Sequence, residues 1–521
     1  MKTNVKNSWP LIIGTLSLAG LSLGGNCPGT GLSAKFSSIG DSVSATAAKS
    51  WRTAAIMDPN SIDGNTFDQN IILPLGTIGP HSMSVFAESA SSFFVMFSRE
   101  TATGDVSVYG TQPITFATGS WPTTMGGFTL LDTETAADEA RNPVTAVDTL
   151  GNSVTVYLQD PGGGAETRRV NAVRRLASSA AWISPVDLRA SAEVAAAVDV
   201  GNESLAIAVD AYNAFVPVWC SSNNILYFNH YRSSVGWRFN TSSTADATWD
   251  GASDCDNSLG VDIAFDGYGN GYGAFVTTGD EVKVRRWQGD TAANWLAAGY
   301  KDITNGTTAC YPRLFMTPDG EGYLFFYTNC AGAAGDLYYS YAAATSTSSP
   351  PVSSDFGAAA AFDTGIGTGN AYIQDNGDPI PPILAVNGNY AVIGHIKQDD
   401  GLMYRLWVSR YDGNSWSTHT AIDQRFGSVT NAALAINSNG EIAAMYSAVY
   451  NGSEVIYVTN YTNGVWKTPT QVSLPGDLVP GNGATARYHP SIAIDASGNA
   501  IGTFTMTDTG GNRRAVAVMY R

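Results

Sequence analysis

Three arginines stand at corresponding places in the internal repeats of this otherwise acidic chain of 521 residues. A guanidinium group presents a planar fork of donors that fits a carboxylate or a sulfate. We therefore expect a pocket for an anionic group, formed by residues that flank the inner strands of the repeats: Arg141, Arg313, Arg487, His81, His489, Tyr311 and Trp219. In the alternative interpretation, each arginine pairs with a neighbouring carboxylate such as Asp160 or Asp256.

Motifs of enzyme active sites are missing from the sequence. It contains no His-Glu-x-x-His, no Gly-x-Ser-x-Gly and no phosphate-binding loop, and its five histidines have no metal-ligand spacing. Hydrolysis of a glycoside would need two carboxylates at a suitable separation. The best candidates for such a pair are Glu100, Asp160 and Asp256.

Oxygen-rich segments raise the question of calcium, although we predict no cofactor. The segment from Asp58 to Asp68 departs from the EF-hand pattern by one residue and is the best calcium candidate. The Asp/Asn-Gly turns lack several oxygen ligands at close spacing, so we interpret them as ordinary hairpin turns. They contain Asp148, Asp266, Asp319 and Asp495.

These residues lie in a unit that recurs eight times along the chain. The last copy begins at Pro490 and has an apolar strand, a turn of the form Asp-x-x-Gly-Asn, a second apolar strand, a Gly-rich turn and a third strand. The first copy, from Met83, is degenerate. Several copies continue to a fourth strand marked by a tryptophan, and we interpret these tryptophans as packing between sheets. They are Trp121, Trp182, Trp237, Trp295, Trp416 and Trp466.

The eighth copy lacks its fourth strand, and a matching strand lies at the other end of the chain. The segment KSWRTAAIMD around Trp51 has the pattern of GVWKTPTQVS around Trp466. Four-stranded units closed by a strand from the opposite terminus predict a β-propeller. We expect eight blades, or seven if the first copy merges with the segment before it. Loops before each first strand and after each second strand should surround the mouth of the central channel.

Four cysteines remain in the repeats, and an even number in an exported protein suggests two disulfides. Cys310 and Cys330 occupy neighbouring ends of one antiparallel hairpin, so we expect them to pair. Cys220 and Cys255 then form the second bridge, between one blade and the next. A zinc site is the weaker alternative, since neither a Cys-x-x-Cys motif nor a nearby histidine accompanies them.

The N-terminus predicts export. Residues 1–26 form a signal peptide with basic residues followed by an apolar stretch too short to span a bilayer. The segment that ends at Cys27 resembles a bacterial lipobox, which implies lipid modification of this cysteine. Residues 27–49 read as a flexible tether and residues 50–521 as a single propeller. We expect a lipid anchor at the outer membrane or cell surface, or otherwise a periplasmic or secreted protein.

The repeats, about 430 residues, resemble those of bacterial sialidase-superfamily propellers. The string from Ser409 to Trp416 is similar to that family's Ser-x-Asp-x-Gly-x-Thr-Trp box. The resemblance implies a carboxylate held by three arginines and a nucleophilic tyrosine paired with a glutamate. The chain is also similar in architecture to eight-bladed lipoproteins of outer-membrane assembly machinery, by analogy alone.

The charge balance, 28 basic against 45 acidic residues, excludes the basic footprint that nucleic acid binding needs. We therefore predict an envelope-anchored propeller that binds a protein or glycan through one face, without catalysis. The alternative is a glycan-active enzyme, a sialidase-like hydrolase or a polysaccharide lyase, with its site at the channel mouth.

Overall fold

The structure is a computed structural model. It describes residues 55–56, 83–89, 92–100, 106–110, 114–115, 129–132, 139–160, 168–178, 181–188, 200–238, 254–287, 300–304, 308–330, 335–344, 356–363, 380–400, 402–422, 427–450, 453–473, 490–507 and 513–520. All of these residues belong to one compact unit, residues 51–520. Every regular element in these ranges is a β-strand. Within them, no helical segment reaches the length and hydropathy that a membrane crossing requires.

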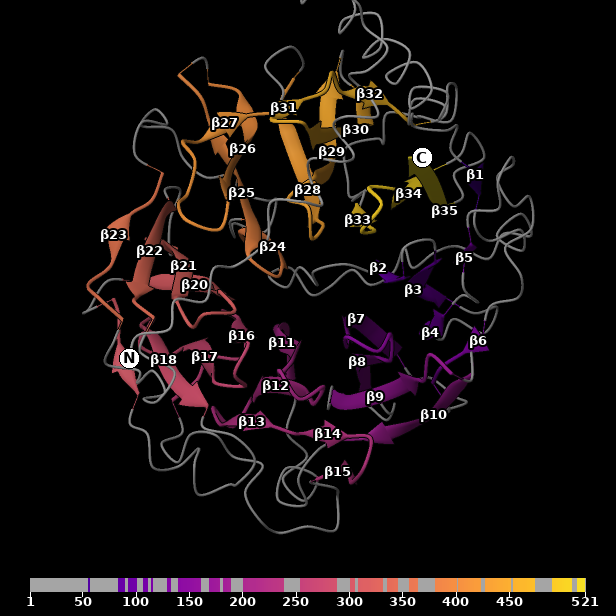
Figure 1. Cartoon of the computed structure of the whole chain (residues 1–521), viewed down its shortest axis with the longest axis vertical. Helices are drawn as coiled ribbons and strands as arrows, with labels where there is room; N and C mark the ends of the chain where they lie inside the picture. Colours follow the sequence, from indigo (N-terminus) through magenta and orange to yellow (C-terminus); the bar gives the residue numbers. More distant parts are fainter. Residues whose placement is uncertain are drawn as a thin grey trace, which may run out of the picture. The chain divides into compact units, whose positions relative to one another are not determined.

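The strands, labelled in Figure 1, form an eight-bladed β-propeller of antiparallel four-stranded blades. Blade 1 contains β2 (Met83–Ser89), β3 (Ser92–Glu100), β4 (Val106–Gly110), β5 (Ile114–Thr115) and β6 (Thr129–Leu130). Blade 2 contains β7 (Glu139–Val147), β8 (Ser153–Asp160), β9 (Arg169–Arg175) and β10 (Trp182–Asp187). Blade 3 contains β11 (Val200–Val209), β12 (Phe215–Ser221), β13 (Leu226–Phe228), β14 (Tyr231–Arg232) and β15 (Gly236–Trp237). Blade 4 contains β16 (Val261–Phe265), β17 (Gly271–Val276), β18 (Val282–Trp287) and β19 (Lys301–Asp302).

The second half of the chain continues the same pattern. Blade 5 contains β20 (Ala309–Met316), β21 (Gly322–Thr328), β22 (Asp336–Ala342) and β23 (Ala360–Ala361). Blade 6 contains β24 (Ile383–Asn387), β25 (Tyr390–Gln398), β26 (Tyr404–Tyr411) and β27 (Thr420–Ala421). Blade 7 contains β28 (Val429–Ile436), β29 (Ile442–Tyr450), β30 (Ser453–Thr462), β31 (Val465–Trp466) and β32 (Thr470–Gln471). Blade 8 contains β33 (Ser491–Ile494), β34 (Ala500–Thr507), β35 (Arg513–Tyr520) and, from the other end of the chain, β1 (Ala55–Ile56). In blades 1, 3 and 7 one of the four strands is broken into two short segments that pair with the same neighbour: β4 and β5, β13 and β14, and β31 and β32.

Contacts between innermost strands close the ring. Each first strand touches the first strand of the next blade, from β2 through β7, β11, β16, β20, β24 and β28 to β33, and β33 touches β2. The chain ends are joined as expected, because Ala55 and Ile56 of β1 pair with Ala517 and Val516 of β35. This pairing covers the outer edge of blade 8, which would otherwise offer unpaired backbone groups. The prediction of eight blades, and of the closing strand, is confirmed.

Local turn chemistry explains why the first hairpin forms in blade after blade. The side-chain oxygen of Asp148 accepts hydrogen bonds from the backbone N–H groups of Leu150 and Asn152, at 2.9 and 2.8 Å. Asp266 and Asp495 hold their turns in the same way. The turn at Asp319 differs, because the Thr317 hydroxyl accepts the bond from the N–H of Glu321 instead. The carboxylates of Asp148, Asp266 and Asp495 are therefore engaged in hairpin geometry, as the sequence predicts.

Candidate functional site: an aromatic cleft between blades 5 and 6

Several of the predicted ligand residues lie outside the described residues. These are His81, Arg487 and His489, and the same holds for the lipidation candidate Cys27, the calcium candidate at 58–68, and the tryptophans Trp51, Trp121 and Trp295. The backbone of Arg141 is described within β7, but its side chain is not. Convergence of the three arginines on one pocket therefore stays a prediction.

Arg313 is described, and it ties blade 5 to its neighbours. Its Nε donates to the carbonyl oxygen of Pro382, just before β24, at 3.1 Å, and one terminal nitrogen donates to the Pro312 carbonyl at 3.1 Å. The guanidinium also interacts with Asp262 of blade 4. Burial raises the pKa of the Asp262 carboxyl, and the charge of Arg313 opposes this shift. The observed partners agree with the alternative of a structural arginine beside a carboxylate, although the carboxylate is Asp262.

Tyr311 and Trp219 are core residues in the structure. Tyr311 is only 5% exposed, and its φ of 55° belongs to a bulge in β20. Trp219 is completely buried and stacks on Tyr227, with ring centroids 6.0 Å apart. Neither side chain presents an aromatic face to solvent at the channel mouth.

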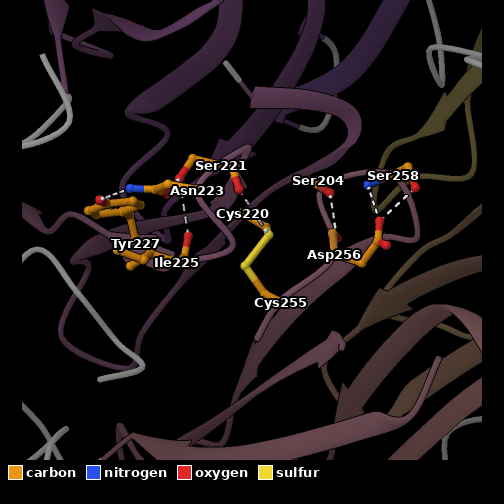
Figure 2. The surroundings of a disulfide bond; sticks show 9 residues. All are labelled: Ser204, Cys220, Ser221, Asn223, Ile225, Tyr227, Cys255, Asp256 and Ser258. Carbon is orange, nitrogen blue, oxygen red and sulfur yellow. Dashed lines mark hydrogen bonds between the residues drawn. A yellow bond between two sulfur atoms is a disulfide. The ribbon is translucent and has the colours of Figure 1, made fainter. Parts of the chain in front are cut away.

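Both expected disulfides are present. Cys310 of β20 bonds to Cys330, just after β21, and the sulfurs are 2.05 Å apart. Cys220, near the end of β12, bonds to Cys255, which precedes β16, and so links blade 3 to blade 4 (Figure 2). The prediction of these two pairs is confirmed.

The acidic residue beside the second bridge serves its own loop. The Asp256 carboxylate accepts hydrogen bonds from the N–H and the hydroxyl of Ser258, at 2.8 and 2.6 Å (Figure 2). One of the three carboxylates considered for hydrolysis is thus committed to a turn. In the described ranges, no cluster of three or more His, Cys, Asp or Glu side chains is arranged to hold a metal ion.

A cleft of about 530 Å³ lies between the outer strands of blades 5 and 6. We call it the blade 5/6 cleft. Blade 5 lines it with Tyr323, Tyr339, Tyr341, Ala361 and Phe362, and blade 6 lines it with Trp416, Ser417, Thr418 and His419. Aromatic walls with a few polar groups are typical of small-molecule sites.

Trp416 is the central side chain of this cleft, and five aromatic rings fix its position. Its centroid lies 5.1 to 6.1 Å from the rings of Phe325, Tyr411, Phe362, Tyr323 and Phe315. Four of these rings belong to blade 5, so Trp416 packs across the boundary between the blades. The prediction that the repeated tryptophans pack sheet against sheet is confirmed here. The same residue also lines the cleft, so packing and ligand contact are not exclusive.

Three phenols, two of which line the cleft, converge on Glu321. Tyr341 and Tyr411 each donate a hydrogen bond of 2.8 Å to this carboxylate, and Tyr323 lies at 3.5 Å. Burial, followed by the bond to Glu321, raises the pKa of Tyr411 to about 12. Burial and the same carboxylate also raise the pKa of Tyr323 and Tyr341. The three phenols stay protonated at neutral pH, which is unfavourable for a nucleophilic tyrosine.

Two neighbouring histidines of blade 6 lie here, and one of them lines the cleft. His419 lines the cleft and donates from Nε2 to the Phe362 carbonyl at 2.8 Å. Behind it, His395 is buried, with its ring centroid 5.4 Å from that of His419. Within the described structure, neither ring nitrogen of His395 has a hydrogen-bond partner. Burial lowers the pKa of both rings, so both are neutral at neutral pH.

Sequence reasoning missed this cleft, because it placed the site at the channel mouth. The available signal was the density of aromatic residues in the fifth copy, in GYLFFY from Gly322 and DLYYSY from Asp336. The fifth copy also lacks a tryptophan in its fourth strand. In the structure, β23 at the end of the low-complexity stretch Ser346–Ala361 supplies that strand, with small alanines.

Comparison with known proteins identifies no family. No protein-family profile matches the chain, and no curated protein sequence matches it significantly. The sialidase-like resemblance of the repeats thus has no support from sequence comparison.

Solved structures with a similar fold include a lectin and a lyase. AofleA from Arthrobotrys oligospora is 13% identical with a TM-score of 0.38, over 77% of this chain and 88% of its own. The polysaccharide lyase Uly1 is 9% identical with a TM-score of 0.40, over 85% and 99%. A fucose-specific lectin from Aleuria aurantia is 11% identical with a TM-score of 0.31, over 60% and 90%.

Proposed function

We propose that this propeller binds a glycan in the blade 5/6 cleft. The observation that carries the proposal is a cleft with aromatic rings on both walls and the side chains of Ser417, Thr418 and His419 along one side. A sugar ring has a face of C–H groups, which packs against the negative face of an aromatic ring, and hydroxyl groups at its edge that need polar partners. The lining supplies both kinds of contact.

Binding rather than turnover is the simpler use of these residues. The phenols near Glu321 are held in their protonated form. Arg313, the predicted anchor of a substrate carboxylate, donates to two backbone carbonyls instead. A glycan-active enzyme at the channel mouth is the alternative. Turnover of an array hit that disappears on changing Arg313 would favour it.

The test starts from a glycan array probed with the purified chain, followed by calorimetric titration of the hits. Trp416→Ala should weaken binding at least about 30-fold, the effect of losing a central aromatic residue worth about 2 kcal/mol. Trp466→Ala is the matched control, because Trp466 occupies the corresponding place in blade 7 and packs on Tyr461. Equal affinity of the two variants would refute the assignment of the site.

A second pair of variants leaves the aromatic packing intact. Ala360 is exposed and pairs with Tyr339, a lining residue, so the two side chains share the cleft face and Ala360→Trp should fill the cleft and abolish binding. Its neighbour Ala361 is also exposed, but it pairs with Tyr338, which packs on the blade 4 side, and its side chain points to that opposite face. Ala361→Trp should therefore bind like the wild type.

We also propose that the chain is exported and anchored through a lipid on Cys27. The signal-like N-terminus supports export, and two disulfides are compatible with an oxidising compartment. Mass spectrometry of the mature N-terminus, with Cys27→Ala as control, would detect the lipid. An unmodified Cys27 in the mature protein would refute the anchor.

A further inference from the structure

We infer that the blade 5/6 cleft selects a neutral, hydroxyl-rich sugar and rejects uronic acids and sulfated sugars. This inference rests on the proposed function and names its ligand class. Its first support is the lining itself, in which none of the nine described residues is Asp, Glu, Lys or Arg. The one titratable ring other than the phenols, that of His419, is neutral because burial lowers its pKa.

The phenol of Tyr341 presents an acceptor to a ligand. Tyr341, which lines the cleft, donates its O–H to Glu321, so its oxygen has only lone pairs left for other partners. The buried Tyr411 donates to the same carboxylate and does not line the cleft. A sugar hydroxyl can donate to such an oxygen, whereas a carboxylate or sulfate offers acceptors alone. The negative charge of Glu321 behind the phenols adds repulsion for an anion.

The cations near the cleft have other partners. Lys397 is 4% exposed at its side chain, and its Nζ contacts Asp363 at 2.5 Å and Asp336 at 3.1 Å. Arg410 directs its guanidinium toward Tyr461 of blade 7, where one nitrogen donates to the phenol at 3.4 Å. Neither of these two described cations is free to offset the hydration that an anionic sugar would lose on entering the cleft, and this cost favours the neutral ligand.

The experiment compares matched pairs of sugars on the intact chain. Polymer-linked glucose, galactose and mannose are each presented beside the corresponding uronic acid and a sulfated form, with fucose as a further neutral probe. We expect at least one neutral sugar to bind about tenfold or more tightly than its acidic partners. This binding should change little with salt, because it involves no ion pair.

One substitution examines the phenol network directly. Glu321→Gln removes the charge and replaces one acceptor oxygen by an N–H donor. One phenol then loses its acceptor at position 321, and its O–H can donate a hydrogen bond to a ligand instead. The preference for neutral over acidic sugars should then fall at least about threefold. Asp319→Asn removes a charge from the same turn without touching the phenols and should leave the preference unchanged.

The outcomes separate the two proposals. Binding of acidic sugars equal to or tighter than neutral ones, still lost in Trp416→Ala, would overturn the neutral class and leave the cleft as the glycan site. An equal loss of preference in both acid-to-amide variants would overturn the role of the phenols. No binding to any probe, or binding that Trp416→Ala and Ala360→Trp leave intact, would overturn the cleft itself.

Discussion

Lowering the pH below neutral should destabilise the propeller through His395, which is buried between blades 5 and 6. Its ring has no hydrogen-bond partner among the described residues, and it lies beside His419 and the charged Lys397. Burial first, and then these two groups, lower its pKa well below the ordinary value of 6.5. In the folded protein the ring therefore stays neutral at mildly acidic pH, whereas in the unfolded chain it takes up a proton.

The sign and size of the effect follow from proton linkage. Below pH 6.5 the unfolded chain binds more protons than the folded protein, so stability falls as the pH falls. The stabilisation is present above 6.5 and decreases by about 1.4 kcal/mol for each pH unit below it. At about pH 5.5, the free energy of unfolding should be lower by about 1.4 kcal/mol than at neutral pH from this one ring.

Urea unfolding followed by tryptophan fluorescence at several pH values measures this slope. His395→Phe keeps an aromatic ring of similar shape but binds no proton, so it should remove this share of the acid sensitivity. Identical pH dependence of unfolding in the wild type and the variant would refute the reasoning, since the ring would then titrate alike in the folded and unfolded states.

Three further predictions concern turns, bridges and phenols. Replacing both cysteines of one bridge by alanine should lower the free energy of unfolding, by up to about 3.8 kcal/mol for Cys220–Cys255 and up to about 3.3 kcal/mol for Cys310–Cys330. These values follow from the closed loops of 35 and 20 residues. Urea denaturation that is unchanged in both double variants would contradict this. Asp266→Ala should lower the free energy of unfolding by about 1–3 kcal/mol, because two backbone N–H groups lose their acceptor. Asp319 is exposed, and Asp319→Ala should change it by no more than about 0.5 kcal/mol. Equal thermal stability of the two variants would argue against the turn analysis. The stabilisation from protonated Tyr411 should persist below its ordinary pKa of 10.0 and be lost as the pH rises through about 12. In an ultraviolet titration, Tyr411→Phe should remove one late-ionising phenol, and an unchanged curve would refute the shift.

The repeat could be read from the sequence because its causes are local. A turn forms where Asp495 can accept the N–H groups of its own loop, and this chemistry recurs at a regular interval along the chain. The match between the segments around Trp51 and Trp466 predicted the closing strand, which Ala55 and Ile56 form. Once the blade register was known, the ends of neighbouring strands fixed the disulfide pairs.

The cleft could not be predicted in this way. Propeller strands are covered on both faces, so an aromatic residue in an apolar run gives no sign of whether it faces the core or a cavity. Tyr323 and Tyr327 stand in the same apolar run, GYLFFY, yet Tyr327 is completely buried and Tyr323 lines the cleft.

The sequence by itself determined the four-stranded blade, the number of blades and the closure of the ring, because these depend on turns and periodicity within each copy. Only the tertiary structure decided which side chains meet. Tyr341 and Tyr411 come from different blades, and they share Glu321 because blades 5 and 6 pack side by side. Such a contact depends on the rotation of one sheet against the next, which the spacing of residues within either copy does not encode.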